Sequence, residues 1–177
     1  MLFRSSTFFE AYLARTGLRF VNADVLAQTL GMDPYFAAQR ADTLRRELVA
    51  LRESFIFETV FSDPVRDKLE FLKTAHGFGY SVVLIFIGVA GPEISGERVA
   101  MRVLQGGHDV PPGKLVERFP RTLNNLKSAL LELPNVWVYD HSDLSEGYRL
   151  VAKKENGQLI KSYDPTPEWF RDLLQRS

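Results

Sequence analysis

Short apolar runs alternate along the chain with longer stretches of helical hydrophobic spacing. The apolar runs are typical of buried strands and lie at residues 18–21, 55–57, 81–87 and 136–139. The helical stretches lie at residues 35–52, 64–75, 92–105, 112–133 and 167–175. This alternation predicts an α/β fold with a mostly parallel central sheet, in which the doubly apolar run 81–87 is a central strand.

Capping and turn residues indicate several of the boundaries. Asp33-Pro34 and Asp63-Pro64 each place an N-cap residue before a proline that suits the first helical turn. Asn156-Gly157 lies between two strand-like runs, 148–153 and 158–162, and predicts a β-hairpin.

Composition and charge limit the classes of function. The chain has 177 residues, which suits one domain, and 45% of them are hydrophobic, enough for a sizeable core. Lys and Arg total 22, as do Asp and Glu, so the basic excess of a general nucleic-acid binder is missing. The absence of cysteine excludes disulfides and thiolate chemistry and fits a cytoplasmic location. The longest apolar stretch, 80–91, is too short for a membrane span.

Polar residues follow three of the predicted strands. Asp24 comes shortly after the first strand, Glu58 and Thr59 follow the second, and residues 140–143 follow the fourth. Ligands of parallel sheets bind at the carboxyl ends of the strands, so we expect Asp24 and Glu58 to share one crevice. There one carboxylate acts as a general base and the other binds substrate or supports a metal ion. The alternatives are that Asp24 only caps the next helix and that Glu58 pairs with a lysine.

A second candidate cluster lies in the helical stretch 92–105. Arg98 and Arg102 are four residues apart and share one helix face, where two guanidinium groups suit a polyphosphate. The alternative is a solvated surface with Glu97 nearby. His108 lies in the glycine-rich loop 106–111 that follows, where it either contacts phosphate or is structural.

These pieces, taken in order, resemble the zeta-toxin-like P-loop kinases, a family also described as predicted ATPases. The matching segments follow a short N-terminal helix and read FVNAD at 20–24, FIFET at 55–59, ERV at 97–99 and RVLQGGHDVP at 102–111. The resemblance implies the three-layer α/β sandwich of a P-loop NTPase, with ATP and Mg²⁺ as cofactors. It also implies roles on the acceptor side. Asp24 matches the base that deprotonates the acceptor hydroxyl, and Glu58, with Thr59 beside it, matches the acid that binds the acceptor.

The resemblance implies further roles on the nucleotide side. Arg98 and Arg102 fall in the region that supplies catalytic arginines to the transferred phosphoryl group. His108 falls where some members carry a further basic residue, and we expect it to bind substrate. Asp140 and Ser142 fall near the adenine side of the nucleotide.

The phosphate-binding loop departs from the family pattern. A P-loop reads Gly-x-x-x-x-Gly-Lys-Ser/Thr after a buried strand, with the hydroxyl on Mg²⁺. Ser6 falls on the position of that metal-binding hydroxyl, and Thr7 is the nucleotide-binding residue after it. Ser5 stands at the position of the Lys, and Arg4 stands at that of the preceding Gly.

We interpret residues 1–5 as a leader that is not native, because Leu2-Phe3-Arg4-Ser5 is what the end of a common sequencing adapter encodes. Residues 6–177 are then a single kinase domain that is truncated inside its P-loop. The first strand and most of the Walker A loop are expected to be missing.

The function that the resemblance implies is ATP-dependent phosphorylation of a hydroxyl of a sugar nucleotide such as UDP-N-acetylglucosamine, impaired in this chain by the truncation. An antitoxin is the protein partner that such a family allows. Two other classes of function stay open. One is a P-loop ATPase without a small-molecule acceptor, in which Asp24 orients water. The other is a non-catalytic binding module that has lost its P-loop.

Overall fold

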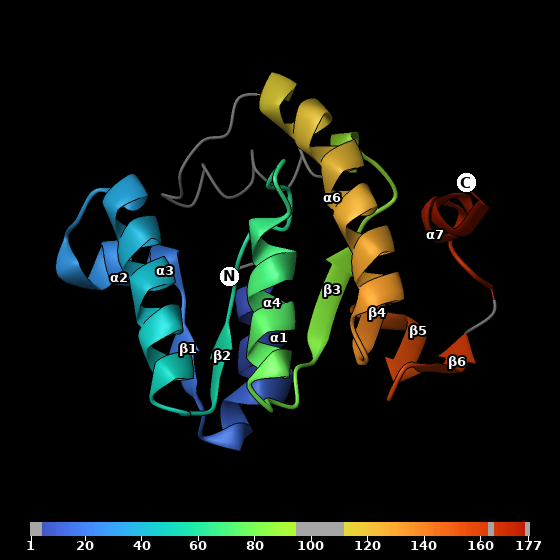
Figure 1. Ribbon diagram of the computed structural model, residues 1–177. Coiled ribbons are helices and arrows are strands. Elements are labelled where there is room, and N and C mark those ends of the chain that lie inside the picture. Colours follow the sequence, from blue (N-terminus) through green and yellow to red (C-terminus); the bar gives the residue numbers. More distant parts are fainter. Residues whose placement is uncertain (1–4, 95–111, 163–164, 176–177) are drawn as a thin grey trace. The chain divides into compact units, whose positions relative to one another are not determined.

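The computed structural model describes residues 5–94, 112–162 and 165–175 (Figure 1). The chain divides into two compact units, a first unit, Met1–Val60, and a second unit, Phe61–Ser177. Both contain helices and parallel strand pairs, so the predicted α/β class is confirmed. No helix in the described part of the chain is both long and apolar enough to cross a membrane.

The first unit is built around one pair of parallel strands. Its elements are α1 (Ser5–Phe8), a π-helical turn (Phe9–Leu13), a 3₁₀ turn (Ala14–Thr16), β1 (Arg19–Val21), α2 (Ala23–Leu30), α3 (Pro34–Ala50) and β2 (Phe55–Phe57). In the parallel pair, Val21 lies opposite Phe57. The core joins Val21 of β1 to Ala41 and Leu48 of α3. The apolar spacing along α3 therefore packs that helix on the strand pair.

Asp33 begins α3 as predicted. Its Oδ1 accepts hydrogen bonds from the backbone N–H groups of Tyr35 at 2.9 Å and Phe36 at 3.2 Å, and Pro34 occupies the first turn. These two bonds satisfy N–H groups that have no partner within the helix.

The second unit contains a sheet of four strands. Its elements are α4 (Asp67–Gly77), β3 (Leu84–Gly88), α6 (Pro112–Glu132), β4 (Val136–Asp140), β5 (Arg149–Glu155), β6 (Gln158–Ser162) and α7 (Glu168–Gln175). The strand order is β3-β4-β5-β6, with β3 parallel to β4 and the other neighbours antiparallel. Asn156 and Gly157 have positive φ values of 49° and 81°, which a tight hairpin turn requires, so the predicted hairpin is confirmed.

Helix α6 and strand β4 hold the most deeply buried residues of this unit. Leu126 of α6, Leu133 directly after that helix, and Val136 and Val138 of β4 are fully buried. The predicted central strand 81–87 forms as β3, but it lies at the edge of the four described strands. Within the described residues, β4 and β5 are the strands that have a neighbour on each side.

Helix α4 begins later than its Asp-Pro signal predicts. The backbone of Arg66 is left-handed, with φ of 60°, so the helix starts at Asp67 and not at Pro64. Asn125 of α6 donates hydrogen bonds to the carbonyls of Phe61 at 3.2 Å and Asp63 at 3.0 Å. This contact holds the segment before α4 in a non-helical path, which the local sequence does not indicate.

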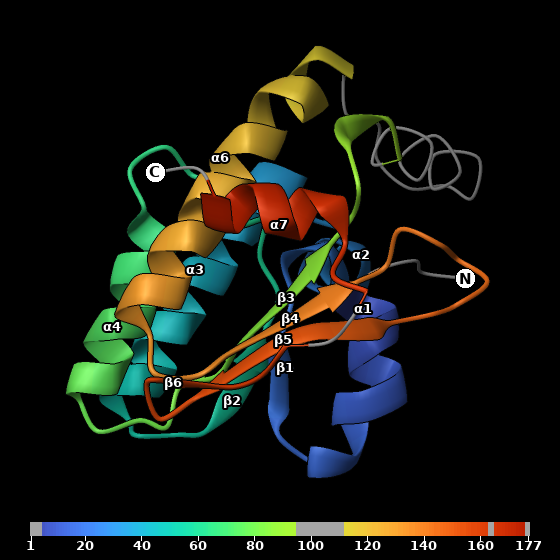
Figure 2. The same cartoon turned by 90° about the vertical axis from the view of Figure 1, so that its right-hand side faces the viewer.

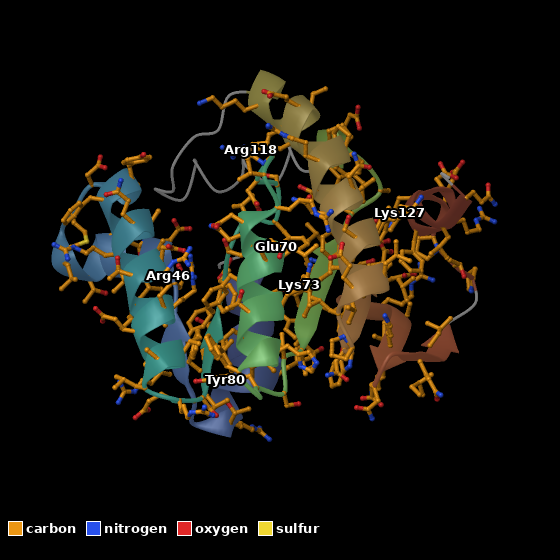
Figure 3. The ribbon with its side chains drawn as sticks, in the orientation of Figure 1. Arg46, Glu70, Lys73, Tyr80, Arg118 and Lys127 are labelled. Atoms are coloured by element: carbon orange, nitrogen blue, oxygen red, sulfur yellow. The ribbon has the colours of Figure 1, made fainter. Side chains whose placement is uncertain are left out.

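Ion pairs join α4 to α6. Figure 3 shows Glu70 and Lys73 on α4. Lys73 of α4 donates to Glu132 of α6 at 2.8 Å and to Glu70 at 3.0 Å, and Arg66 also pairs with Glu132. The hydrogen bond from Lys73 lowers the pKa of Glu132, and the same bond raises the pKa of Lys73. Exposed pairs of this kind contribute little stability, so buried apolar contacts hold the unit together.

Candidate functional site

The carboxyl ends of β1 and β2 bring Asn22 next to Glu58. Both residues directly follow the paired residues Val21 and Phe57, and the Glu58 N–H donates to the Val21 carbonyl at 3.1 Å. The Asn22 Nδ2 donates to the Glu58 carboxylate, at Oε2, over 2.7 Å. Asn22 is only 4% exposed, whereas Glu58 and Thr59 are half-buried. A parallel register therefore places an oriented carboxylate at this strand end.

Asn22, and not Asp24, is the cap of α2. The Asn22 Oδ1 accepts from the backbone N–H groups of Asp24 at 2.8 Å and Val25 at 3.2 Å. The alternative in which Asp24 only caps the helix is therefore wrong. Asp24 lies in the first helical turn with an exposed side chain, and no described residue pairs with its carboxylate. The side chain of Asp24 is thus accessible to a ligand.

A buried arginine of α3 lies behind this strand end. The Arg45 side chain is 5% exposed, and its guanidinium lies over the Phe57 ring, 5.0 Å from the centroid. Its Nη2 donates to Asp42 at 2.7 Å, while its buried Nε has no hydrogen-bond partner among the described residues. Phe57 directly precedes Glu58, so Arg45 and Asp42 stabilise the backbone that carries the carboxylate.

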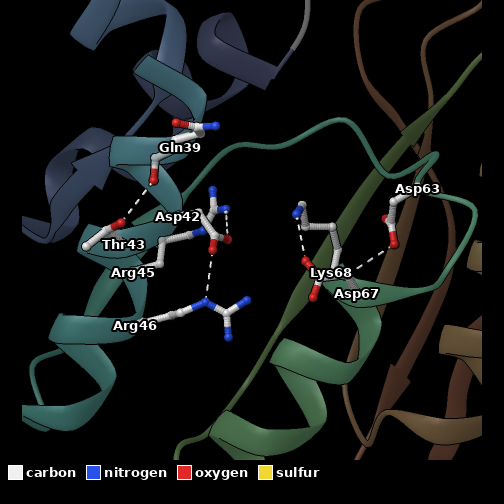
Figure 4. Close-up of polar contacts among 8 residues, drawn as sticks. All are labelled: Gln39, Asp42, Thr43, Arg45, Arg46, Asp63, Asp67 and Lys68. Carbon is white, nitrogen blue, oxygen red and sulfur yellow. Dashed lines mark hydrogen bonds and ion pairs between the residues drawn. The ribbon is translucent and has the colours of Figure 1, made fainter. Parts of the chain in front are cut away.

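Asp42 bonds two arginines of the same helix (Figure 4). It accepts from Arg45 at 2.7 Å and from Arg46 at 2.9 Å. Burial works to raise the pKa of Asp42, but the hydrogen bonds and charges of Arg46 and Arg45 outweigh it and lower the pKa. Asp42 is therefore a charged partner that keeps Arg45 compensated inside the fold.

The N-terminal hydroxyls lie on α1. The side chain of Ser6 is outside the described positions, so its predicted role at the metal is not tested. The Thr7 Oγ1 is buried and has no hydrogen-bond partner within the described part of the chain. A buried hydroxyl of this kind fits a phosphate or a Mg²⁺–phosphate ligand, because such a ligand would satisfy it. Among the described residues, no group of three or more His, Cys, Asp or Glu side chains is arranged to hold a metal ion.

In the second unit, Asp140 at the end of β4 is engaged by its own fold. Its Oδ1 accepts from the Trp169 indole N–H at 2.9 Å and from the Ser142 hydroxyl at 2.6 Å. Its Oδ2 accepts from Arg149 at 3.3 Å. Asp140 is 8% exposed. The two predicted adenine-side residues therefore bond to each other, and Asp140 also ties the strand end to α7.

Trp169 also packs on the end of β3. A Cβ at Gly88 would lie 2.3 Å from the Trp169 ring, so glycine is the residue that admits the indole. Figure 2 shows one end of α7 beside the carboxyl ends of β3 and β4. Trp169 is 5% exposed. The C-terminal helix is thus anchored at this edge of the sheet by one ring and one hydrogen bond.

Three predicted residues, Arg98, Arg102 and His108, lie within 95–111 and so outside the described residues. Of the predicted helix 92–105, residues 92–94 are described and are helical.

Sequence reasoning did not select Asn22, Arg45 or Gly88. Asn22 had a signal, because asparagine directly before a helix is a favoured cap. Arg45 had one too, since it falls on the apolar face of α3 between Ala41 and Leu48. Gly88 had only a weak signal, a glycine at the end of an apolar strand.

Helices packed with parallel strand pairs, and carboxylates at the strand ends, define an α/β protein with a candidate ligand site at the carboxyl edge of β1 and β2. A solved structure of the PezAT chromosomal toxin-antitoxin system of Streptococcus pneumoniae is similar to this chain, with a TM-score of 0.56 and 16% sequence identity. The match covers 96% of this chain and 71% of that chain. The expected resemblance is therefore confirmed at the level of the fold. No protein-family model matches the sequence, and a comparison with curated proteins finds no significant match.

Proposed function

We propose that this chain is an ATP-dependent kinase of the zeta-toxin type, which transfers the γ-phosphoryl group of ATP to a hydroxyl of a sugar nucleotide such as UDP-N-acetylglucosamine. The observation that carries the proposal is the pair of carboxylates at the ends of β1 and β2. Asp24 is exposed without a described partner, and Glu58 is held by a buried amide that also caps the helix of Asp24. The fold similarity to a toxin-antitoxin protein supports it.

Each carboxylate has a separate task in this proposal. Asp24 accepts the proton of the acceptor hydroxyl. At the same time the oxygen of that hydroxyl bonds to the γ-phosphorus, and the bond from the phosphorus to the ADP oxygen breaks. Glu58, with Thr59 beside it, binds the acceptor and orients that hydroxyl. Phosphoryl transfer relies mainly on such positioning and on charge stabilisation, so a small number of placed side chains is sufficient.

The proposed nucleotide-binding residues are not those at the ends of β1 and β2. Ser6 and Thr7 would hold the phosphates and Mg²⁺, which neutralises phosphate charge when bound. The Thr7 hydroxyl, which has no hydrogen-bond partner among the described residues, fits this role. Arg98, Arg102 and His108 would contact the transferred group and the substrate. For Asp140 and Ser142, an adenine-side role stays a prediction, and it would use groups other than the carboxylate oxygens that Trp169, Ser142 and Arg149 already bond.

The partner and location belong to the same proposal. Because the similar structure comes from a toxin-antitoxin system, an antitoxin protein is the class of protein partner that we propose. A cytoplasmic location stays a prediction from the absence of cysteine.

The test is a transfer assay with ATP, Mg²⁺ and UDP-N-acetylglucosamine, read by mass spectrometry. It uses the chain itself and a version with a Gly-x-x-x-x-Gly-Lys loop ahead of Ser6. We expect the acceptor to gain the mass of one phosphate, and we expect Asp24→Asn to reduce the rate by a factor of about 10²–10⁴. Asp33→Asn, at an exposed helix cap in the same unit, is the matched control and should retain the rate.

Three results would change the proposal. Transfer that survives Asp24→Asn would exclude Asp24 as the base. ATP hydrolysis that does not depend on any acceptor would indicate a P-loop ATPase instead. Failure of both proteins to bind ATP would favour a non-catalytic binding module.

A further inference from the structure

Both ends of the Asn22 amide are used inside the first unit. Oδ1 accepts from the N–H groups of Asp24 at 2.8 Å and Val25 at 3.2 Å, and Nδ2 donates to Glu58 Oε2 at 2.7 Å. Only the amide oxygen can accept from two backbone N–H groups, so these bonds determine the orientation of the amide. The nitrogen must then face the Glu58 carboxylate.

A helix cap alone does not need that nitrogen. Asp33 caps α3 with the same two-bond pattern, in which Oδ1 accepts from Tyr35 N–H at 2.9 Å and Phe36 N–H at 3.2 Å. Aspartate and asparagine are about equally good caps, so either residue would begin α2. What asparagine adds at position 22 is a donor that contacts a carboxylate on the neighbouring strand.

Because the Asn22 amide is buried, the loss of its donor is expected to have a large effect. Asn22 is 4% exposed, so water is a poor substitute for either of its partners. The same side chain sets the direction of the Glu58 carboxylate and the first turn of α2, which carries Asp24. A change at Asn22 would therefore move both carboxylates of the proposed site at once.

We infer that Asn22 is a positioning residue, whose buried amide holds the acceptor-binding carboxylate of Glu58 and the helix turn of the base Asp24 in one fixed arrangement. This inference rests on the proposed function and adds the residue that aligns the site. Asn22 acts through Glu58 and Asp24.

The main test is Asn22→Asp, a change of nearly identical shape. The variant keeps the cap oxygen, loses the donor to Glu58, and sets two carboxylates against each other. At about pH 8 we expect affinity for UDP-N-acetylglucosamine, measured by calorimetry, to fall at least about tenfold. As the pH is lowered, the two carboxylates share a proton that restores a donor between them, so affinity should recover. Asp33→Asn, the same exchange at the matched cap, should leave affinity and its pH dependence unchanged.

A double variant separates positioning from a purely structural contact. Asn22→Asp with Glu58→Gln restores a hydrogen bond in the opposite direction, because the new amide at position 58 donates to the new carboxylate at position 22. We expect the melting temperature to return towards the wild-type value while acceptor affinity stays weak, because the charge has moved to another strand. Recovery of both quantities would show that the contact is only structural and would overturn the inference. Unchanged affinity and pH profile in Asn22→Asp alone would also overturn it.

A separate measurement tests this inference even if the proposed function fails. If the wild-type chain neither binds nor phosphorylates UDP-N-acetylglucosamine, the proposed substrate fails. Carboxyl ¹³C NMR titration of Asn22→Asp then still tests the positioning contact. Coupled titration of the carboxylates at positions 22 and 58 would support it, and independent titration would overturn it.

Discussion

The end of β1 in the first unit and the end of β4 in the second each carry a buried polar side chain, and the two are used differently. Asn22 follows β1 and contacts a carboxylate of the neighbouring strand, while Asp24 beside it stays exposed with no described partner. Asp140 ends β4, and its two oxygens accept from three donors of its own unit, one of them on the C-terminal helix.

The difference shows that the carboxyl end of a parallel strand is not a functional site by itself. A polar side chain at this position can be free for a ligand or can be fully used in holding a helix to the sheet. Variants at the end of β4 should therefore change stability, and variants at the end of β1 should change binding and transfer with smaller changes in stability.

The largest stability effect is expected for Asp140→Ala. Removing this carboxylate leaves the buried Trp169 indole N–H and the Nη2 of Arg149 without their acceptor. We expect the free energy of unfolding, measured by urea titration, to fall by about 3 kcal/mol. Asp143→Asn, at an exposed residue of the following loop, should change it by less than about 0.5 kcal/mol. Equal values for the two variants would mean that Asp140 is not an anchor.

Gly88→Ala should have the next largest effect. The new methyl group would lie 2.3 Å from the Trp169 ring, so the indole must move away from the end of β3. We expect a loss of about 2 kcal/mol in unfolding free energy together with a changed tryptophan emission spectrum. Gly77→Ala is the matched control, because nothing lies within 4 Å of that position at the end of α4. A Gly88→Ala protein as stable as this control would contradict the close packing.

Asp42→Asn tests the buried arginine behind the first strand pair. It weakens the compensation of Arg45, which is 5% exposed, so we expect a loss of about 1.5 kcal/mol at neutral pH. Asp67→Asn, which affects the more exposed Lys68–Asp67 pair in the second unit (Figure 4), should cost under about 1 kcal/mol.

The pH dependence of this effect has a definite sign. The pKa of Asp42 is lower in the folded chain than in the unfolded one. The carboxylate therefore contributes to the free energy of unfolding above the unfolded pKa of about 3.9, and this contribution is lost as the pH falls below that value. Urea titrations of wild type and Asp42→Asn should therefore converge in acid. A difference that grows as the pH falls would contradict the lowered pKa.

The smallest stability effect is expected for Asp24→Asn. Its exposed carboxylate has no described partner and contributes only through the dipole of α2, so the unfolding free energy should change by about 0.5 kcal/mol. Combined with the large loss of transfer expected above, this would separate Asp24 from Asp140. A destabilisation as large as that of Asp140→Ala would remove the distinction between the two strand ends.

Local signals predicted the elements that local interactions decide. The strand at 55–57 and the hairpin turn at Asn156-Gly157 are as expected, and Asp33 caps α3, because each depends on residues close in the chain. Asp63-Pro64 carries the same signal as Asp33-Pro34, yet α4 starts three residues later. Asn125, more than sixty residues away, bonds the carbonyls of Phe61 and Asp63 and prevails over the local preference.

The features of the candidate site also differ in whether the sequence could predict them. The order of strand-end residues indicated Asp24 and Glu58, because strand ends can be read from a run of apolar residues. The hydrogen bond between Asn22 and Glu58 could not be read, since it depends on the parallel register that sets Val21 against Phe57. For Asp140, position in the sequence indicated a ligand site, whereas the docking of Trp169 shows that its oxygens are already bonded.

The sequence by itself determined the α/β class, most strand and helix positions, and the carboxylates that end β1 and β2, because hydrophobic spacing and capping are properties of neighbouring residues. Only the tertiary structure decided which polar side chains remain available. Whether a carboxylate faces a ligand or a tryptophan N–H depends on contacts between residues far apart in the chain. Hydrogen bonds of this kind stabilise the fold only after the strands and helices have packed.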